Sequence, residues 1–557
     1  MNRHSSEDVI KLPPTPKDLT RHRLTKPHEL LLVVMCGLPA RGKSFLSKKL
    51  HRFLYWRGEQ VKIFNVGERR RQHSTSGAHD ASFFGASNRN LREEIAQGVL
   101  NEAVHWLRHG DDEEPSPAPS PKPARRSFGA DGELNMERSR SMSESDEDPT
   151  ARRPTRTAIF DATNSTMQRR QDVVTCMAKE LPQCRVVFVE SLCDDEQVIE
   201  RNLRQKIAMS PDYRDKPFEE ALADLRQRID KYESQYESLS TQERISFIKL
   251  FNLSSQLHIN LIYGTIAKSL VPYLMGINIS RRPIWLVRAA HCTGTPPSTP
   301  SAERTNTTVV VTRNAPLSEE GLAFAQRLGR FVRHRSAEFA ALEWASSDGA
   351  SSIDVTDGVA ALRTGSPGDD GRGRRERTEV PEQEPEREED VVRRAQSPMD
   401  DSALCSVFTS TLPRSMQTAA FCACRDGRPQ VMSALNPLDR GMAYGWTDSE
   451  FEVRMPEASA RWRSDVRHTR FPGGESFHDL FQRIEPLLIE LEQQTGPVLV
   501  VSHLSVLQAL ASYFTGDSLG EALNSSIPHH TVLQLTPSPH TMMWERELIP
   551  LTKDEPR

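Results

Sequence analysis

The chain has 557 residues and a formal charge of −4, from 72 Lys and Arg against 76 Asp and Glu. This length is too great for one ordinary domain, and the near-neutral charge argues against a nucleic-acid binder, which usually carries a basic excess. No apolar run approaches the 18 residues that a membrane span needs, and the eight cysteines form no CxxC pair. We therefore expect a cytoplasmic protein with reduced thiols and with neither a nucleic-acid nor a membrane partner.

The first part of the chain alternates apolar runs with helical patterns. Residues 1–28 are polar, which predicts a disordered leader. The sequence then predicts a buried strand over 30–36, a helix over 43–55 and a strand over 61–65, an order typical of a parallel α/β domain. A segment rich in Pro, Ser, Arg and Glu interrupts this pattern over 111–156, and we expect it to be disordered. Its Arg-Ser pairs are compatible with the action of protein kinases and equally with a solvated loop without a role.

The α/β pattern resumes after this insert and later begins a second time. The predicted elements are strands over 157–161 and 186–190, helices up to about residue 276, a strand over 284–287, a helix over 476–494, a strand over 498–501 and a helix after Leu504. Polar inserts interrupt the second region at 292–306 and 347–402. We thus predict two α/β domains, 29–280 and 281–548, and a tail over 549–557.

A glycine-rich phosphate loop lies between the first predicted strand and helix. Its residues are Gly37, Leu38, Pro39, Ala40, Arg41, Gly42, Lys43 and Ser44, which match G-x-x-x-x-G-K-[ST]. In this pattern backbone N–H groups surround phosphate oxygens, the lysine reaches the β- and γ-phosphates, and the serine hydroxyl is a ligand of Mg²⁺. The first domain is therefore predicted to bind ATP and Mg²⁺.

A carboxylate and several arginines surround this loop in the sequence. Asp161 ends the strand TAIFD, where a second metal-facing carboxylate belongs in P-loop enzymes. Arginines recur at predicted strand and helix ends, among them Arg70, Arg92 and Arg228, and arginine binds phosphate bidentately. By spacing alone, the sequence predicts a kinase of a small phosphorylated metabolite.

These residues resemble the 6-phosphofructo-2-kinase/fructose-2,6-bisphosphatase family. The motifs that carry the resemblance are GLPARGKS, FNVG followed by two arginines, FDATN, VESLC, SPDY and RIDKYESQYESL. The resemblance covers residues 29–290 well and 310–548 more loosely. It implies a P-loop kinase domain followed by a phosphoglycerate-mutase-like α/β domain, and a kinase half that transfers the ATP γ-phosphoryl to the 2-hydroxyl of fructose 6-phosphate. A homodimer is a further implication.

The resemblance also implies the roles of individual residues. The residues with an implied catalytic role are Lys43, Asp161 and Cys193. The implied metal ligands are Ser44 and Asp161. Asn202 and Lys206 join the phosphate loop in binding the nucleotide. The implied contacts to fructose 6-phosphate are Arg71, Arg92, Thr163, Arg169, Arg228 and Tyr232.

One position departs from the family pattern. The family has a lysine four residues before the proline of SPDY, where this chain has Ile207, with Lys206 one place earlier. On a helix this offset turns the side chain by about 100°. Either a local slip restores the lysine, or the contacts on the adenine side differ.

The second domain lacks two groups that the resemblance leads us to expect. The family strand ends in R-H-G with a histidine nucleophile, whereas here Arg288 is followed by Ala289, whose methyl group cannot form a phosphoenzyme. The family's acid, a glutamate after L-N, corresponds to Pro437, which cannot transfer a proton. We therefore expect the bisphosphatase to be inactive.

Other parts of the phosphatase pocket remain in the sequence. They are Arg288, Arg414, Glu475 and His503, and they are equally compatible with phosphosugar binding and with a purely structural role. Three alternatives stay open at this point. They are a bifunctional enzyme that uses His291 or His503, a non-catalytic sensor of ATP and sugar phosphates, and a P-loop kinase with another acceptor.

Overall fold

The computed structural model describes residues 30–73, 83, 88–111, 155–214, 216–253, 256–293, 315–347, 405–538 and 544–551. The predicted leader, nearly all of the three predicted inserts and the end of the predicted tail lie outside these residues. Contacts divide the chain into two compact units, Met1–Ile277 and Asn278–Arg557. Within the described residues, each unit has a six-stranded sheet with helices, so the predicted α/β class is confirmed. No helix in the described part is long and apolar enough to cross a membrane.

The first unit has the sheet order β2-β3-β1-β4-β5-β6, in which β6 alone runs antiparallel to its neighbour. Its strands are β1 (Leu30–Cys36), β2 (Gln60–Asn65), β3 (Arg156–Asp161), β4 (Arg185–Leu192), β5 (Phe247–Phe251) and β6 (Gln256–Asn260). Its helices are α1 (Lys43–Arg57), α2 (Val66–His73), α3 (Arg89–His109), α4 (Met167–Glu180), α5 (Glu196–Met209), α6 (Phe218–Glu233) and α7 (Thr265–Gly276).

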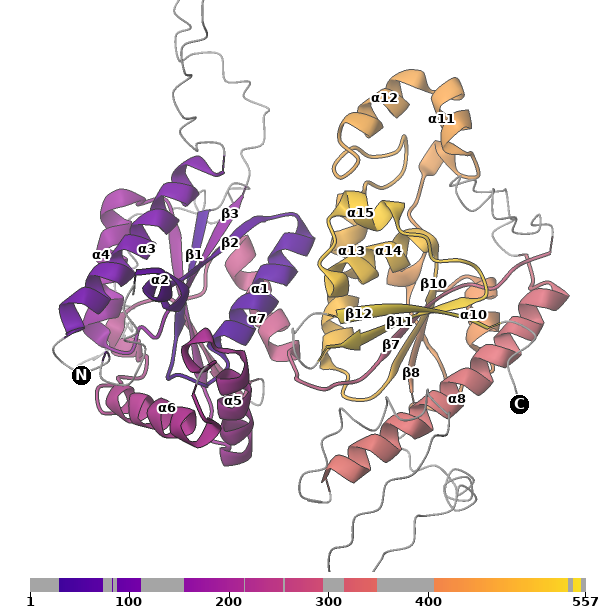
Figure 1. Ribbon diagram of the computed structural model, residues 1–557. Helices are drawn as coiled ribbons and strands as arrows, with labels where there is room; N and C mark the ends of the chain where they lie inside the picture. Colours follow the sequence, from indigo (N-terminus) through magenta and orange to yellow (C-terminus); the bar gives the residue numbers. More distant parts are fainter. Residues whose placement is uncertain are drawn as a thin grey trace, which may run out of the picture. The chain divides into compact units, whose positions relative to one another are not determined.

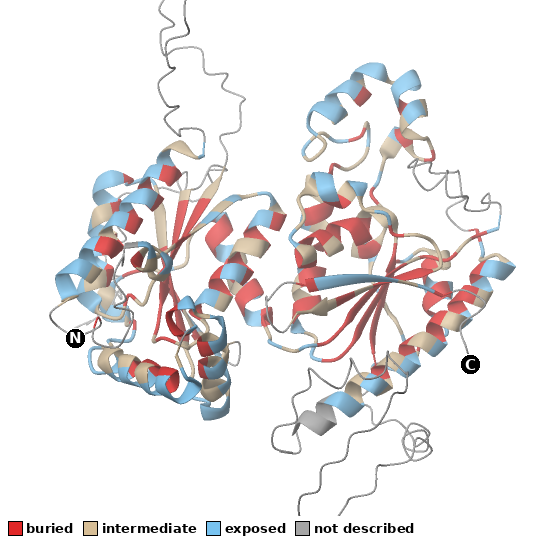
Figure 2. Ribbon diagram, viewed as in Figure 1, coloured by how far each residue is buried: buried red, intermediate tan, exposed pale blue. Residues whose placement is uncertain are grey.

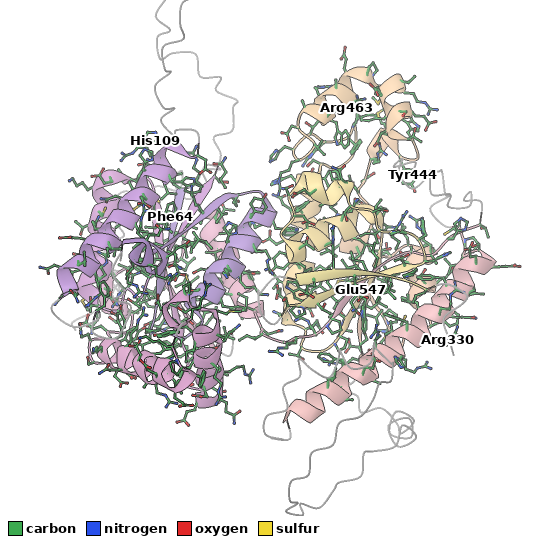
Figure 3. The ribbon with its side chains drawn as sticks, viewed as in Figure 1. Phe64, His109, Arg330, Tyr444, Arg463 and Glu547 are labelled. Carbon is green, nitrogen blue, oxygen red and sulfur yellow. The ribbon has the colours of Figure 1, made fainter. Side chains whose placement is uncertain are left out.

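Both faces of this sheet are buried, which explains the unbroken apolar run of β1. Leu32 and Val34 belong to a core that includes residues of α3 and α4, whereas Leu31 and Val33 are buried on the opposite face. In Figure 1, α3 and α4 lie on one side of the sheet, and α1 and α7 lie on the other. Phe64, labelled in Figure 3, packs against Trp106 of α3 with ring centroids 6.0 Å apart.

The topology brings the predicted site residues of the first unit to one edge of the sheet. Strands β2, β3, β1 and β4 are mutually parallel, so their carboxyl ends lie at the same edge. These ends are Asn65, Asp161, Cys36 and Leu192, and the phosphate loop follows β1 directly. In open α/β sheets this edge is where ligands bind.

The second unit has the sheet order β12-β11-β7-β10-β8-β9, with β11 and β12 antiparallel to their neighbours. Its strands are β7 (Ile284–Arg288), β8 (Ser406–Thr409), β9 (Gln430–Val431), β10 (Val498–Ser502), β11 (Thr531–Pro537) and β12 (Trp544–Pro550). Its helices are α8 (Glu319–Ser347), α10 (Pro413–Ala419), α11 (Asp448–Arg454), α12 (Pro456–Ser464), α13 (Phe477–Gln493), α14 (Leu504–Thr515) and α15 (Leu519–Asn524).

The central strands of this sheet are buried and its last strand is exposed, as Figure 2 shows. Trp285 and Val287 pack with residues of α8, α10, β8 and β10 in one core cluster. Along β12 the residues between Trp544 and Ile549 are exposed, including Glu547, which is labelled in Figure 3. An edge strand with charged side chains is protected from pairing with other chains.

Candidate active site

The phosphate loop of the first unit is held in a fixed shape by its neighbours. Gly37, Ala40 and Gly42 have positive φ angles of 131°, 60° and 83°. A Cβ atom at Gly37 would lie 2.6 Å from the carbonyl oxygen of Ser191, so only glycine fits there. The Gly37 N–H donates to the Thr163 carbonyl at 3.0 Å.

Side chains from other elements also bind the carbonyl groups of this loop. The Asn202 amide of α5 donates to the Ala40 carbonyl at 3.1 Å, and the Ser191 hydroxyl donates to the Arg41 carbonyl. These bonds turn backbone carbonyls outward and leave the loop's N–H groups to face an anion at the N-terminus of α1. Asn202 thus acts on the loop itself.

Lys43, Ser44 and Asp161 meet at the carboxyl edge of the sheet. The Ser44 hydroxyl donates to Asp161 Oδ2 at 2.9 Å, and the Lys43 ammonium donates to the Leu38 carbonyl at 2.6 Å. Burial lowers the pKa of Lys43 to about 8, although the Asp161 carboxylate opposes this shift. Burial also raises the pKa of Asp161, against the effect of Lys43. The charges are therefore held close together with little water.

Asn65 is a member of this group that the sequence reasoning missed. Its amide nitrogen donates to Asp161 Oδ2 at 2.8 Å, and its amide oxygen accepts the Glu68 N–H at 3.0 Å. The two bonds fix the orientation of the amide. The available signal was the FNVG motif, because Asn65 ends β2 and pairs in register with Asp161 at the end of β3.

Lys206 points toward the site in spite of its shift along the sequence. Ile207 is buried in a core formed with residues such as Leu225, which makes it the core-facing member of the pair. The pKa of Lys206 is lowered to about 7, first by burial and then by the positive charges of Arg228 and Lys43. Lys206 therefore shares the site with Lys43, as a lysine that contacts the nucleotide would.

A buried group of arginines and one aspartate lies next to this cluster. Arg228 of α6 lies 3.6 Å from Asp212 of the SPDY motif, and Asp212 also pairs with Arg70 at 2.5 Å. Burial and the nearby Arg70 charge lower the pKa of Arg228, whose surroundings also include Tyr232. The resemblance predicted Arg71, and not Arg70, as a contact to fructose 6-phosphate. Arg71 lies on the same helix, α2, and is half-buried.

The remaining predicted residues lie around this group. Arg92 donates to the Phe83 carbonyl at 3.0 Å, and the Cys193 thiol lies 3.9 Å from the Asp195 carbonyl and near the Arg41 charge. Arg169 lies in the first turn of α4, and its Nη2 atom is buried without a hydrogen-bond partner among the described residues.

In the second unit, the pocket residues converge at the carboxyl ends of parallel strands. Arg288 ends β7, His503 follows β10, and Arg414 begins α10 after β8. His503 Nε2 is 2.9 Å from the Ser410 hydroxyl, and its Nδ1 is 3.5 Å from an Arg414 nitrogen. Burial and the charges of Arg414 and Arg288 hold the pKa of His503 well below its usual value. The group is thus a buried cationic cluster around a neutral imidazole.

Ala289, the predicted position of the absent nucleophile, lies beside a histidine that the sequence reasoning did not single out. Ala289 is 5% exposed, and the ring of His529 interacts with its backbone carbonyl. Burial and the Arg288 charge lower the pKa of His529 to about 2, so its imidazole is neutral. His529 and His530, which precede β11, belong to none of the motifs described above. The sequence pattern therefore did not indicate a role for them.

Glu475 plays a supporting part in this pocket. Both of its carboxylate oxygens accept hydrogen bonds from Arg483 at 2.9 Å. Arg483 also donates to the Asn436 carbonyl at 3.0 Å and to the Pro437 carbonyl at 3.4 Å. Glu475 therefore holds Arg483 and, through it, the loop that carries Pro437.

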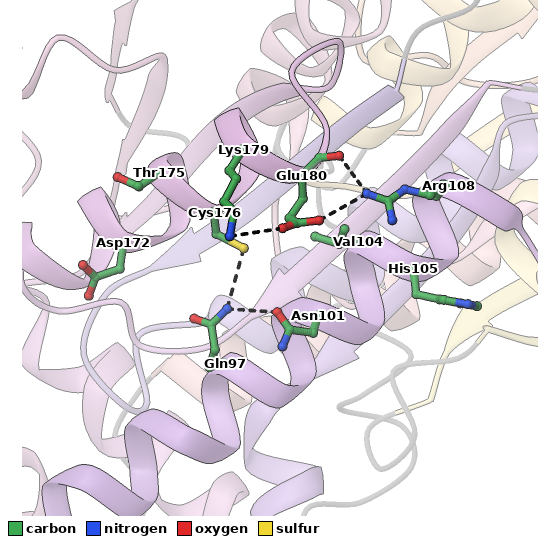
Figure 4. A pocket seen from close by; sticks show the side chains of 10 residues that line it. All are labelled: Gln97, Asn101, Val104, His105, Arg108, Asp172, Thr175, Cys176, Lys179 and Glu180. Atoms are coloured by element: carbon green, nitrogen blue, oxygen red, sulfur yellow. Dashed lines mark hydrogen bonds and ion pairs between the residues drawn. The ribbon is translucent and has the colours of Figure 1, made fainter.

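A hollow of about 670 Å³ lies between α3 and α4, away from the residues described above (Figure 4). Its lining residues are Gln97, Asn101, Val104, His105, Arg108, Asp172, Thr175, Cys176, Lys179 and Glu180. Arg108 donates to the Glu180 carbonyl at 2.8 Å, and Gln97 donates to Asn101 at 3.0 Å and to Cys176 at 3.6 Å. The lining side chains pair with one another instead of converging on one point, and none is a predicted site residue.

Two family models match this chain, one chiefly in the first unit and one in the second. A model of the 6-phosphofructo-2-kinase family matches residues 21–113 and 151–282, and a model of the histidine phosphatase superfamily, branch 1, matches residues 386–547. The chain belongs to the 6-phosphofructo-2-kinase/fructose-2,6-bisphosphatase family. The second match begins beyond β7, so it leaves out Arg288 and Ala289.

Curated relatives carry names of the same family. A probable 6-phosphofructo-2-kinase of Schizosaccharomyces pombe is 29% identical over 92% of this chain, which spans 69% of that protein. A 6-phosphofructo-2-kinase/fructose-2,6-bisphosphatase of Arabidopsis thaliana is 29% identical over 91% of this chain, and the match spans 52% of that protein. A protein of the same name from Aquarana catesbeiana is 29% identical over 91% of this chain, and the match spans 82% of that protein. A solved putative alpha-ribazole-5'-P phosphatase from Escherichia coli matches 48% of this chain and 96% of its own at 16% identity and a TM-score of 0.30.

Proposed function

We propose that the first unit transfers the γ-phosphoryl group of ATP to the 2-hydroxyl of fructose 6-phosphate, which makes fructose 2,6-bisphosphate. The observation that carries this proposal is the cluster of Lys43, Ser44, Asp161, Lys206 and Arg228 at one sheet edge. It combines a phosphate loop with buried cations beyond it, as transfer between two phosphorylated substrates requires. The names of the curated relatives support the same acceptor.

The residues present fit Mg²⁺ and ATP. Ser44 and Asp161 offer a hydroxyl and a carboxylate oxygen 2.9 Å apart, and Mg²⁺ prefers oxygen ligands of this kind. The phosphate loop with its positive φ angles would hold the triphosphate through backbone N–H groups. When bound, Mg²⁺ offsets the negative charge of the phosphates.

The chain's own residues then act by position and charge. Lys43 and Lys206 supply positive charge where the transferred group gains negative charge, in a site with little water to screen it. The two hydrogen bonds to Oδ2 of Asp161 orient that carboxylate, and Oδ1 would be the oxygen that accepts a hydrogen bond from the acceptor hydroxyl. Arg228 belongs to the arginine group that would hold the 6-phosphate of the sugar.

We further propose that the second unit has no bisphosphatase activity. Ala289 stands where the family has its histidine nucleophile, and Pro437 stands where it has its acid. His503 is held by Ser410 and Arg414, which fits phosphate binding more than attack on phosphorus. The predicted homodimer and the predicted phosphorylation of the insert, most of which lies outside the described residues, stay predictions.

The deciding experiment is an assay of purified protein with Mg-ATP and fructose 6-phosphate that follows acid-labile fructose 2,6-bisphosphate. We expect product from the wild-type chain and a loss of about 100-fold or more in kcat for Lys43→Met, since one charge-stabilising donor is worth about that factor. Lys48→Met, on the exposed side of the same helix, is the matched control and should keep full activity. Binding of ATP without any product would instead favour a non-catalytic sensor.

A further inference from the structure

The loop that carries Thr163 is fixed by a buried arginine that belongs to no site motif. This acceptor-side loop, residues 162–166, joins β3 to α4. Arg170 lies in the first turn of α4, and its side chain is 1% exposed. Arg170 turns inward, although an arginine at the start of a helix has no favourable interaction with the helix dipole. A cation that is buried to this extent must be compensated by an ion pair and by hydrogen bonds.

Arg170 makes hydrogen bonds to the loop and to a second segment of the chain. Its Nε and Nη2 atoms donate to the two carboxylate oxygens of Glu243, both at 2.8 Å. Its Nη1 atom donates to the Asn164 carbonyl at 3.2 Å and to the Glu237 carbonyl at 2.8 Å. Because the guanidinium is planar, these four bonds fix the direction of the loop carbonyl as well as its distance.

The second segment, residues 234–243, comes directly after α6. It is bound to the acceptor-side loop by the Glu237 N–H, which donates to the Ser165 carbonyl at 2.8 Å, and to the start of α4 by the Met167 N–H, which donates to the Glu237 carboxylate at 2.5 Å. It is anchored to the sheet by Glu190 of β4, which is fully buried and lies 3.3 Å from Lys249 and 3.1 Å from the Ser238 hydroxyl. The segment therefore connects the loop rigidly to the sheet and to the end of α6.

The loop itself has a conformation that needs such support. Asn164 has a φ of 42°, in the left-handed region that residues other than glycine rarely adopt, and it is 3% exposed. Its amide donates to the Met35 carbonyl at 2.8 Å on the phosphate-loop side, while Arg170 holds its carbonyl on the other side. The strained residue is thus fixed between the two.

We propose that Arg170, through its pair with Glu243, is a positioning residue that aligns Thr163 and the start of α4 with α6 for binding and phosphorylation of the acceptor. This inference rests on the proposed function. Nucleotide binding should depend on it less, because the phosphate loop, within the described part of the chain, has only one bond to this loop, from the Gly37 N–H to the Thr163 carbonyl, and is also held by Asn202 and Ser191. Arg170 does not touch either substrate in this proposal.

The test compares four variants of the full chain: Arg170→Lys, Arg170→Met, Glu243→Gln and the double variant Arg170→Met/Glu243→Met. Arg170→Lys keeps the charge but loses the fork of bonds, so we expect kcat/KM for fructose 6-phosphate to fall about 10- to 100-fold, as small misplacements do in transfer reactions. The Kd of Mg-ATP, from calorimetry without acceptor, should stay within about twofold. Arg108→Lys is the matched control, because its pair with Glu180 is exposed, and it should match the wild type in both.

The double variant separates positioning from simple stability. Removing one partner leaves a buried charge and should lower the unfolding temperature, whereas replacing both with apolar side chains should restore much of it. We expect the double variant to regain stability and to keep the raised KM for fructose 6-phosphate. If the double variant regained both its stability and a wild-type KM for fructose 6-phosphate, the proposal would be overturned. Wild-type kinetics in Arg170→Lys would overturn it as well. A wild-type chain that makes no product would contradict the proposed function instead.

Discussion

Lys43 and Lys206 lie in surroundings that keep their pKa values low before any substrate binds. Burial is the main cause for both, and the Arg228 charge adds to it at Lys206, where the pKa is about 7. A triphosphate favours the charged form of each amine, so binding raises both pKa values. Nucleotide affinity and proton uptake are therefore linked at these two residues.

We expect Mg-ATP affinity to fall as the pH rises from 7 to 9, because unliganded Lys206 loses its proton as the pH passes its pKa and must regain it on binding. Calorimetry at pH 8 in Tris and in HEPES, whose ionisation enthalpies differ, measures this uptake. Lys206→Met should reduce the uptake and weaken binding about tenfold or more. Lys179→Met, an exposed lysine on α4, is the control. Equal uptake in Lys206→Met and wild type would contradict the expectation.

At the level of single elements, the N-terminus of α13 shows how local bonds position the pocket of the second unit. Ser476 and Asp479 form a capping box, with the Asp479 N–H donating to the Ser476 hydroxyl at 3.2 Å. Arg470 binds both oxygens of Asp479, at 2.7 and 2.6 Å. The same helix carries Arg483, which Glu475 holds, so the cap stabilises one wall of the pocket.

Asp479→Asn should cost about 1 kcal/mol at pH 7, seen as a fall of about 2–4 °C in the unfolding temperature of the second unit. The Arg470 hydrogen bond holds the pKa of Asp479 below its usual value, so this stability is present above about pH 4 and is lost as the pH falls through the folded-state pKa. The difference between variant and wild type should therefore shrink at pH 3. Scanning calorimetry at both pH values tests this, with Glu545→Gln on β12 as a neutral control. If the unfolding temperatures of variant and wild type differed by the same amount at pH 3 and pH 7, the stabilisation would not depend on the ionised Asp479 carboxylate.

On the proposed function, the whole chain combines a complete site in one unit with an incomplete one in the other. Each unit has its own core and its own group of cations at the carboxyl edge of its sheet. The first has a phosphate loop and a carboxylate, and we propose that in the second Ala289 and Pro437 stand at the positions of the nucleophile and the acid. The expected behaviour of the molecule is synthesis without breakdown.

We therefore expect ADP and fructose 2,6-bisphosphate to accumulate in a 1:1 ratio until fructose 6-phosphate is exhausted. An active bisphosphatase would convert fructose 2,6-bisphosphate back to fructose 6-phosphate. More ADP than fructose 2,6-bisphosphate would then accumulate. Lys43→Met protein incubated with 2-³²P-labelled product should leave it intact and yield no labelled protein after denaturation in alkali, which preserves phosphohistidine. Label on the chain would show that another residue, such as His529 or His291, takes the nucleophile's place.

Local sequence determined much of this protein. The strand, loop and helix around Gly37–Ser44 follow from apolar patterning and glycine placement. The α/β class and the family were accessible because each depends on residues that are neighbours along the chain, and the prediction that Ala289 and Pro437 replace a nucleophile and an acid rests on single motif positions in the same way.

Tertiary structure alone decided which distant residues meet. Asn65 joins Asp161 because β2 and β3 are parallel neighbours, across the insert that separates them in sequence. Lys206 turns into the site because Ile207 fills the core beside α6, which overrides a one-residue shift in the motif. Arg170 and His529 carry no motif, and their surroundings are formed by segments far away in the chain. Packing and strand order, not local pattern, place such side chains, because burial acts on whichever surfaces the fold brings together.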